Sequence, residues 1–245
     1  DRTLMKYLLP GTTEENLYQL GIYGANYKLA MLMTLFIQAY RYAADPFFFN
    51  QSNNPDAKKL FGQVTKVFTI AGSAVFLLVT LFIDVFKYFI RTEEYWQGLH
   101  VVPVLLMANL FLGLYFNLSV WYKLTDRTKL GGIVAGAGAL LTIVLNVLLI
   151  PRLGYEGAAW ATLIVYVFLA VISYLLGKKY YPVDYPIGKM VLYIISALVI
   201  FAVHQLLPSF EGALGYAVSG GLLLLFIVLL VIVDGRDLKQ MLAKS

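Results

Sequence analysis

Seven stretches of mostly apolar residues run through this chain, and each is long enough to cross a lipid bilayer as a helix. A spanning helix needs about 20 such residues, because the hydrocarbon layer is roughly 30 Å thick and a helix rises about 1.5 Å per residue. The stretches cover residues 20–44, 67–90, 101–123, 130–150, 156–177, 189–207 and 213–233. Short polar segments separate them, so neighbouring helices should pack antiparallel. The sequence therefore predicts an all-α, polytopic transmembrane helical bundle.

The composition also indicates an integral membrane protein. Hydrophobic residues make up 60% of the 245 residues and charged residues only 13%, whereas soluble domains are about 25% charged. The net charge of +5 does not indicate nucleic-acid binding, because the basic residues lie in short loops between the apolar stretches. The chain has no cysteine and two isolated histidines. We therefore expect neither a disulfide nor a metal site, and no other cofactor.

The first 19 residues precede the first complete stretch. Residues 1–9 are typical of the last turns of a helix, and the chain does not begin with methionine, so we expect a fragment whose N-terminal part is missing. Residues 11–19 should form a polar outer loop, in which Thr12 and Thr13 are candidate N-caps for the first helix. Residues 20–245 would then form one transmembrane lobe.

Basic residues at the helix ends predict the orientation. Of the 19 Lys and Arg residues, thirteen lie at one set of ends, five lie at the other, and Lys28 lies within a span. The larger set is Arg41, Lys58, Lys59, Lys66, Lys123, Arg127, Lys129, Lys178, Lys179, Lys189, Arg236, Lys239 and Lys244. The smaller set is Arg2, Lys6, Lys87, Arg91 and Arg152. Because basic residues concentrate on the cytoplasmic side of membrane proteins, we expect a cytoplasmic C-terminus.

The first complete stretch carries polar groups that lipid would not solvate. Its candidate substrate-binding residues are Tyr23, Asn26, Tyr27, Lys28, Gln38 and Arg41. A charged side chain near the bilayer centre costs on the order of 3 kcal/mol, so such residues usually face a bundle interior or a wet cavity. At about 100° per residue, the two tyrosines, the glutamine and the arginine share one side of a helix, with the lysine beside them. The pattern predicts a helix that lines the polar cavity of a membrane transporter.

The individual charges of this region allow more than one interpretation. Lys28 could extend toward the outer interface, or it could attract an anionic substrate or exchange a proton. Arg41 lies near the predicted cytoplasmic end, so it could contact lipid headgroups or grip a phosphate group of the substrate with two hydrogen bonds. Asp84 is the one carboxylate predicted well within a span, and its spacing from Lys87 favours a local ion pair over a role in ion coupling.

Other polar and small residues are expected to serve helix packing. Asn109, Asn117 and Asn146 are candidates for hydrogen bonds between helices. The small-residue run that contains Gly132 and Gly136 should allow two helices to approach closely, with a flexible hinge as the alternative.

No residue pattern supports catalysis, so we expect that the protein is not an enzyme. The sequence shows no paired carboxylates within a span, no Ser/His/Asp set within reach, and no glycine-rich phosphate loop followed by Lys-Ser or Lys-Thr. A membrane polymerase or acyltransferase would need a large outer loop or an intramembrane His/Asp site. A purely structural subunit would leave a lysine and an arginine on one membrane helix unexplained. Energy for transport would come from an ion gradient, or movement would be downhill.

Two stretches resemble a known family. Residues 145–166, LNVLLIPRLGYEGAAWATLIVY, resemble the recurring helix–corner–helix of oligosaccharide flippases in the multidrug/oligosaccharidyl-lipid/polysaccharide exporter superfamily. In this corner Pro151 should end one helix and Gly154 should shape the turn. Residues 21–49, GIYGANYKLAMLMTLFIQAYRYAADPFFF, resemble the start of the C-terminal lobe of Wzx-type polysaccharide biosynthesis proteins. Those proteins typically carry Glu-Pro where this chain has Asp45-Pro46.

The resemblance implies a flippase of the bacterial cytoplasmic membrane, of which this chain would be one lobe of two. Its implied substrate is undecaprenyl-diphosphate-linked oligosaccharide, moved to the outer leaflet for surface polysaccharide assembly by alternating access. The implied partners are the missing N-terminal lobe, the lipid bilayer and the polysaccharide polymerase machinery. The alternative is a multidrug or other small-molecule exporter of the same superfamily, for which acidic rather than basic cavity residues would be expected.

Overall fold

The computed structural model describes the backbone of residues 2–208 and 212–242, and the side chains of residues 3–208 and 212–235. Over these ranges the chain is helical and contains no β-strand. The helices are α1 (Arg2–Leu8), α2 (Thr13–Asn50), α3 (Ala57–Leu81), α4 (Ile83–Phe86), η1 (Lys87–Phe89), η2 (Glu93–Val101), α5 (Val102–Leu124), α6 (Thr128–Leu153), α7 (Tyr155–Tyr180), α8 (Ile187–Leu206) and α9 (Ala213–Leu242). Within the described residues, seven helical stretches are long and apolar enough to cross a membrane, which confirms the predicted polytopic bundle.

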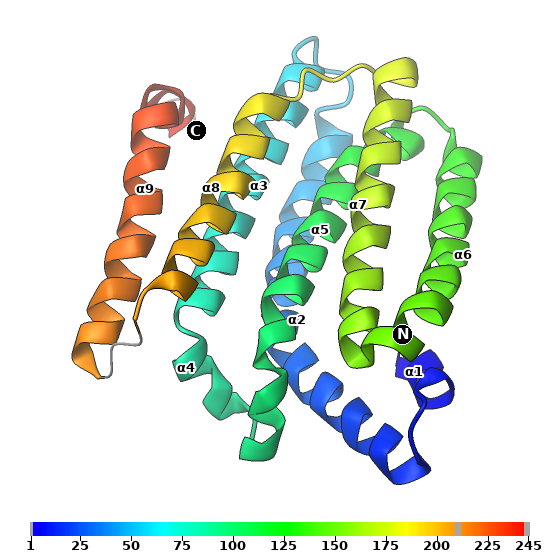
Figure 1. Cartoon of the computed structure of the whole chain (residues 1–245). Coiled ribbons are helices and arrows are strands. Elements are labelled where there is room, and N and C mark those ends of the chain that lie inside the picture. The colour runs from blue at the N-terminus through cyan, green and yellow to red at the C-terminus, as the bar shows by residue number, and fades with distance from the viewer. Residues whose placement is uncertain (1, 209–211, 243–245) are drawn as a thin grey trace.

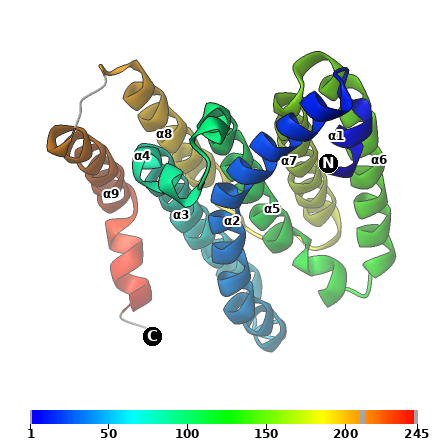
Figure 2. The same cartoon turned by 90° about the horizontal axis from the view of Figure 1, so that it is seen from below.

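The long helices stand side by side, with α9 at one edge and α6 at the other (Figure 1). Between them α5 is central and packs against α2, α3 and α7, while α6 packs on α7 and α8 packs on α3. Helix α1 and the first turns of α2 run across one end of the bundle (Figure 2). We call this end, which also holds α4 and η2, the outer end, following the predicted orientation. The opposite end holds the loops α2–α3, α5–α6 and α7–α8 (Figure 1).

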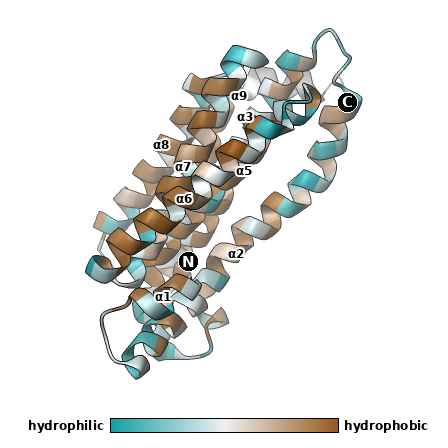
Figure 3. Cartoon of the chain, turned by 90° about the vertical axis from the view of Figure 1, so that its right-hand side faces the viewer, coloured by the Kyte–Doolittle hydropathy of each residue, from teal (hydrophilic) through white to brown (hydrophobic). Residues whose placement is uncertain are grey.

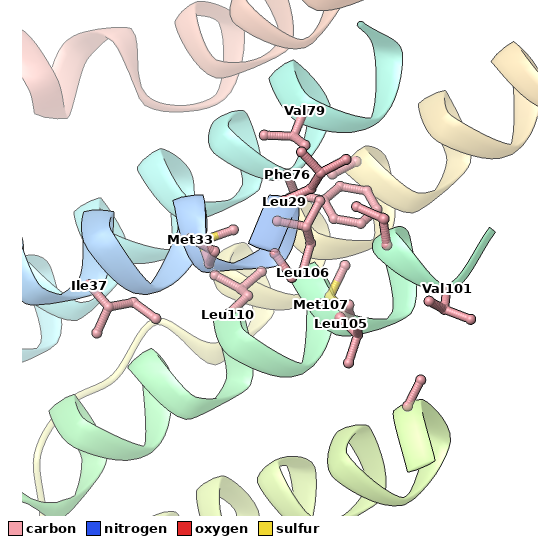
Figure 4. Close-up of a cluster of buried hydrophobic side chains, with 14 of the residues drawn as sticks. Leu29, Met33, Ile37, Phe76, Val79, Val101, Leu105, Leu106, Met107 and Leu110 are labelled. Carbon is pink, nitrogen blue, oxygen red and sulfur yellow. The ribbon is translucent and has the colours of Figure 1, made fainter. Parts of the chain in front are cut away.

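The best-packed part of the core lies where α5 meets α2 and α3 (Figure 4). Leu29, Met33 and Ile37 of α2 are buried there beside Leu106 and Leu110 of α5. Lipid tails are as apolar as leucine, so helices in a membrane associate through close packing and hydrogen bonds rather than through the hydrophobic effect. The tight fit of these side chains is therefore what holds the centre of the bundle together.

Glycines permit the close approach of α3 and α5. A Cβ atom added at Gly113 would lie 2.2 Å from Cζ of Phe68, and one at Gly72 would lie 2.4 Å from Cδ1 of Leu110. The prediction that Gly132 and Gly136 serve close packing is wrong for the described residues, because an added Cβ there would have nothing within 4 Å. These two glycines point away from α7, on the open side of α6.

Asn109 and Asn117 link the central helices, as expected. Nδ2 of Asn109 donates a hydrogen bond to the carbonyl oxygen of Ala30 over 3.1 Å, which joins α5 to α2. The hydroxyl of Tyr40 on α2 donates to Oδ1 of Asn117 on α5. Nδ2 of Asn146 donates to the carbonyl oxygen of Thr142 within its own helix, α6, so its predicted role between helices stays a prediction.

The start of α2 differs in part from the prediction. Thr12 is its N-cap, in a capping box with Glu15, as its position in the sequence predicted. Residues 13–19, which we expected in a loop, are nevertheless helical and form the first turns of α2. The capping box explains the early start, since it satisfies backbone N–H groups that otherwise have no partner at a helix end.

Two prolines do not end their helices where the sequence suggested. Helix α2 continues through Pro46 to Asn50, and α6 continues through Pro151 to Leu153. An interior proline costs about 3 kcal/mol because one backbone hydrogen bond is lost and the ring crowds the preceding turn. Packing offsets this cost after Pro46, where the buried ring of Phe48 meets Phe61 edge-on at 4.9 Å between centroids. Gly154, with a φ of 60°, is where α6 ends.

The second predicted stretch is displaced along the chain. Helix α3 begins at Ala57 and ends at Leu81, whereas residues 67–90 were expected to span the membrane. The segment after Leu81 contains the short helices α4 and η1 instead. The apolar residues of this segment made it look like a continuation of the span, although they belong to the outer end of the bundle.

Candidate functional site

One face of α2 remains open in this chain. Lys28, Met31, Leu35, Gln38 and Tyr42 are exposed and recur every three or four residues, so they share one side of the helix. The helix lies along one face of the bundle and mixes hydrophilic and hydrophobic residues over its length (Figure 3). No other described helix covers this open face of α2.

The predicted polar stripe is divided between this open face and the interior. Tyr23 and Asn26 are buried. Nδ2 of Asn26 donates hydrogen bonds to the carbonyl oxygens of Ile22, at 2.9 Å, and Tyr95, at 2.8 Å, and so joins α2 to η2. The expectation that all six candidates face one cavity is therefore wrong for these two, because their side of α2 packs against η2 and α5. A direct role of either residue in substrate binding stays a prediction.

Arg41 lies at the border between the buried and the open side of α2. Its side chain is 30% exposed, Nη2 lies 3.5 Å from Oδ2 of Asp45, and the guanidinium lies 4.2 Å from the ring centroid of Phe116. Nε is buried and has no hydrogen-bond partner among the described residues. Gln38, Arg41, Asp45 and neighbouring residues of α2 line a hollow of about 280 Å³. The contacts with Asp45 and Phe116 orient a guanidinium that retains donors for an anionic group.

Lys28 is the second cation of the open face. Its side chain is exposed and has no ion-pair partner in the part of the chain that the structure describes. It lies thirteen residues before Arg41, which corresponds to roughly 20 Å along the helix. Tyr27 is half-buried between Lys28 and the core, with its ring 5.9 Å from that of Tyr23. The open face thus offers two separated positive charges, with the amide of Gln38 between them.

A buried cluster of charges lies in the C-terminal part of α9, away from the outer end of the bundle. It was not predicted from the sequence. Nζ of Lys66 on α3 lies 3.0 Å from Oδ2 of Asp234 on α9, and Lys189 on α8 pairs with Oδ1. The hydroxyl of Tyr193 also donates to Asp234. The side chains of Asp234 and Lys66 are 0% and 4% exposed. We call these four residues the Asp234 cluster, and it binds three helices together.

The sequence contained one signal for this cluster. Asp234 directly follows the long apolar run of the last stretch, whereas both lysines were assigned to cytoplasmic ends as topology signals. The expectation that Asp84 is the carboxylate within a span is wrong, because it lies in α4 with its side chain 73% exposed. Its predicted ion pair with Lys87 is confirmed, at 2.7 Å.

Within the described residues, no group of three His, Cys, Asp or Glu side chains could hold a metal ion. Side chains of Arg2 and Arg236 to Ser245, which include several residues of the orientation argument, lie outside those that the structure describes. The predicted orientation therefore stays a prediction.

No family model matches the chain, and no curated protein matches its sequence. Its structure is similar to that of "Lipid II flippase MurJ, inward closed conformation", with a TM-score of 0.56 and 17% sequence identity. The match covers 92% of this chain and 54% of that chain. The chain therefore spans about half the length of the structure that it matches, and it has the all-helical fold of one part of a membrane flippase.

Proposed function

We propose that this chain is one lobe of a flippase of the multidrug/oligosaccharidyl-lipid/polysaccharide exporter superfamily, and that the whole protein moves a lipid-linked precursor across the bacterial cytoplasmic membrane. The fold similarity to a lipid II flippase supports this class of activity. The second lobe would cover the open face of α2 and supply the opposite wall of the cavity. Transport would proceed by alternating access of the two lobes.

The specific substrate that we propose is undecaprenyl-diphosphate-linked oligosaccharide for surface polysaccharide assembly. The observation that carries it is Arg41, whose partly exposed guanidinium is oriented by Asp45 and Phe116 and borders a hollow on the open side of α2. A diphosphate is an anion that such a fork of donors recognises. Lys28 would attract the same group from the other half of the helix, and Gln38 and Tyr27 would contact sugar hydroxyls.

The product of this activity would be consumed by the polysaccharide polymerase machinery on the outer side.

Within the described residues of α2, the one carboxylate bordering the hollow is Asp45, which is already paired with Arg41. With Lys28 as a second cation, the open face carries more positive than negative charge, which favours an anionic substrate over the cationic compounds that many drug exporters carry.

The test uses the full-length parent gene. Its deletion should cause lipid-linked oligosaccharide to accumulate on the inner leaflet, and wild type should cure this defect. Arg41→Ala and Lys28→Ala should complement poorly at equal protein levels, while Arg91→Ala, a matched control at an exposed position outside the α2 face, should complement fully. An unchanged lipid-linked pool after deletion would reject the oligosaccharide substrate and favour the exporter alternative.

A further inference from the structure

A second hollow lies at the outer end of the bundle, and none of its described lining residues belongs to α2. It has a volume of about 610 Å³ and is enclosed by α4, the last turn of α8 and the first turns of α9. These three segments lie together at one side of the bundle (Figure 1). Its polar lining includes Asp84, Lys87, Tyr88, His204, Tyr216 and Ser219. No residue of α2 lines it, so it is separate from the candidate substrate face.

The hollow carries one positive and one negative group in fixed relation. Nζ of Lys87 lies 2.7 Å from Oδ1 of Asp84 and 5.0 Å from the ring centroid of Trp96, so its position is held from two sides. The hydrogen bond with Asp84 raises the pKa of Lys87, which keeps the amine charged at neutral pH. Lys87 is largely covered and Asp84 is largely exposed. Each group keeps hydrogen-bonding capacity beyond the pair, since an ammonium has three donors and a carboxylate has a second oxygen.

The wall opposite this pair is held by a chain of hydrogen bonds. The hydroxyl of Ser219 on α9 donates to the carbonyl oxygen of Leu81, at 2.9 Å. Since that proton is then used, the 3.2 Å contact between Ser219 Oγ and His204 Nε2 requires the imidazole nitrogen to be the donor. Among the described lining residues, Asp84 and Lys87 supply one negative and one positive charge side by side.

The surroundings of the hollow suit a lipid. The hydroxyls of Tyr88 and Tyr216 belong to exposed tyrosines, which are typical of the level of lipid headgroups. Leu206 on α8 and Leu214 on α9 are exposed beside the hollow, and the outward sides of both helices continue as apolar surface. A molecule with a small charged head in the hollow could thus lay its chains along α8 and α9.

We propose that this hollow binds the headgroup of a zwitterionic phospholipid with a primary ammonium, the phosphoethanolamine class. The lipid phosphate accepts hydrogen bonds from Lys87 and from the tyrosine hydroxyls, and the lipid ammonium donates to Asp84. An anionic lipid without an amine would leave the second oxygen of Asp84 beside a phosphate, with no lipid N–H group to donate to it. A quaternary ammonium has no N–H donor for the carboxylate. The lipid would hold α9 to α4 at the end where few protein contacts do so.

The test measures lipid binding to the delipidated full-length protein by native mass spectrometry. Phosphatidylethanolamine should bind about fivefold more tightly than phosphatidylglycerol or phosphatidylcholine, the factor that one exposed ion pair supplies. Asp84→Asn should abolish this preference, and Lys87→Met should weaken both phosphatidylethanolamine and phosphatidylglycerol. Arg91→Ala, an exposed basic residue at the same end that does not line the hollow, should change nothing.

A double variant separates binding from a structural role of the ion pair. Asp84→Lys/Lys87→Asp keeps a pair but reverses its direction, so it should preserve the thermal stability and lose the lipid preference. Equal binding of the three lipids to wild type, or an unchanged preference in Asp84→Asn, would overturn the proposal. Binding of free phosphoethanolamine as tight as that of the lipid would also overturn it, by showing that the ligand is a soluble phosphate compound. These outcomes are independent of the flippase assay.

Discussion

Helices α5 and α9 are both strongly apolar, yet they have opposite places in the fold. In the membrane-spanning window of the η2–α5 stretch 56% of the residues are buried, compared with 11% for α9. Helix α5 contacts four long helices, α2, α3, α6 and α7, with glycines and tightly fitted side chains at its centre, whereas α9 contacts α3 and α8. The few buried residues of α9 include Ser219, Phe226 and Asp234. In a membrane, polar and small residues indicate where a helix contacts its neighbours better than apolar residues do. An apolar side chain is accommodated as well by lipid tails as by another helix.

The largest effect is expected at the polar attachment of α9. Asp234→Ala removes the buried carboxylate that Lys66 and Lys189 share, so it should cost about 3–5 kcal/mol of stability. Thermal unfolding of the full-length protein in detergent measures this. The control is Asp84→Ala, which removes a mostly exposed ion pair and should cost at most about 1 kcal/mol. Equal losses in both variants would mean that the Asp234 cluster is not a tight attachment.

The next largest effect is expected in the packing of α5. Gly113→Val would bring its Cβ atom to 2.2 Å from Cζ of Phe68, so it should destabilise the protein by about 1–3 kcal/mol through overpacking. Gly132→Ala is the matched control on α6, where an added Cβ has nothing within 4 Å, and it should be neutral or stabilise by up to about 1 kcal/mol. Destabilisation by both variants to the same extent would contradict the different burial of the two helices.

A smaller effect is expected at the outer attachment of α9. Ser219→Ala removes the hydrogen bonds to Leu81 and His204, and hydrogen bonds between membrane helices are worth about 0.6 kcal/mol on average. Ser196→Ala is the control, since that hydroxyl bonds only within α8, to the carbonyl oxygen of Tyr193. A loss for Ser219→Ala as large as that for Asp234→Ala would show that α9 is held as strongly at its outer end as at the Asp234 cluster.

The smallest effect is expected on the exposed side of α9. Leu224→Ala truncates a side chain that no described helix covers, so the change in stability should stay within about 0.5 kcal/mol. Leu106→Ala is its counterpart in α5 and should cost about 2–5 kcal/mol, because it leaves a cavity in the packed centre. Similar losses for the two leucines would mean that another part of the full-length protein covers this side of α9.

These contrasts also explain how far the sequence could be interpreted. Apolar length predicted the seven spanning helices, and the Thr12 cap followed from local chemistry alone. The continuation of α2 beyond Pro46 depends on packing between Phe48 and Phe61, which no local rule contains. The residue pattern of a single helix also does not indicate which neighbouring helix covers each of its sides. Asn26 was therefore expected to face a cavity, but its side chain donates a hydrogen bond to the carbonyl oxygen of Tyr95.

The Asp234 cluster shows the same limit most clearly. Its lysines lie at positions 66 and 189 and its carboxylate at 234, so its members are distant in sequence and each resembles an ordinary topology signal. Counting basic residues at the helix ends treats each lysine separately and does not show that the two share a carboxylate. Only the arrangement of α3, α8 and α9 brings the three charges together.

The order of synthesis gives this cluster a consequence for biogenesis. A ribosome makes Lys66 first, Lys189 later and Asp234 last, so both lysines enter the membrane before their shared carboxylate exists. Until α9 inserts, α3 and α8 would hold two like charges close to each other, which disfavours their final packing. Insertion of α9 would then be the step that completes the assembly of the bundle. A nascent chain halted before Asp234 should be degraded by membrane proteases rather than accumulate as a stable intermediate.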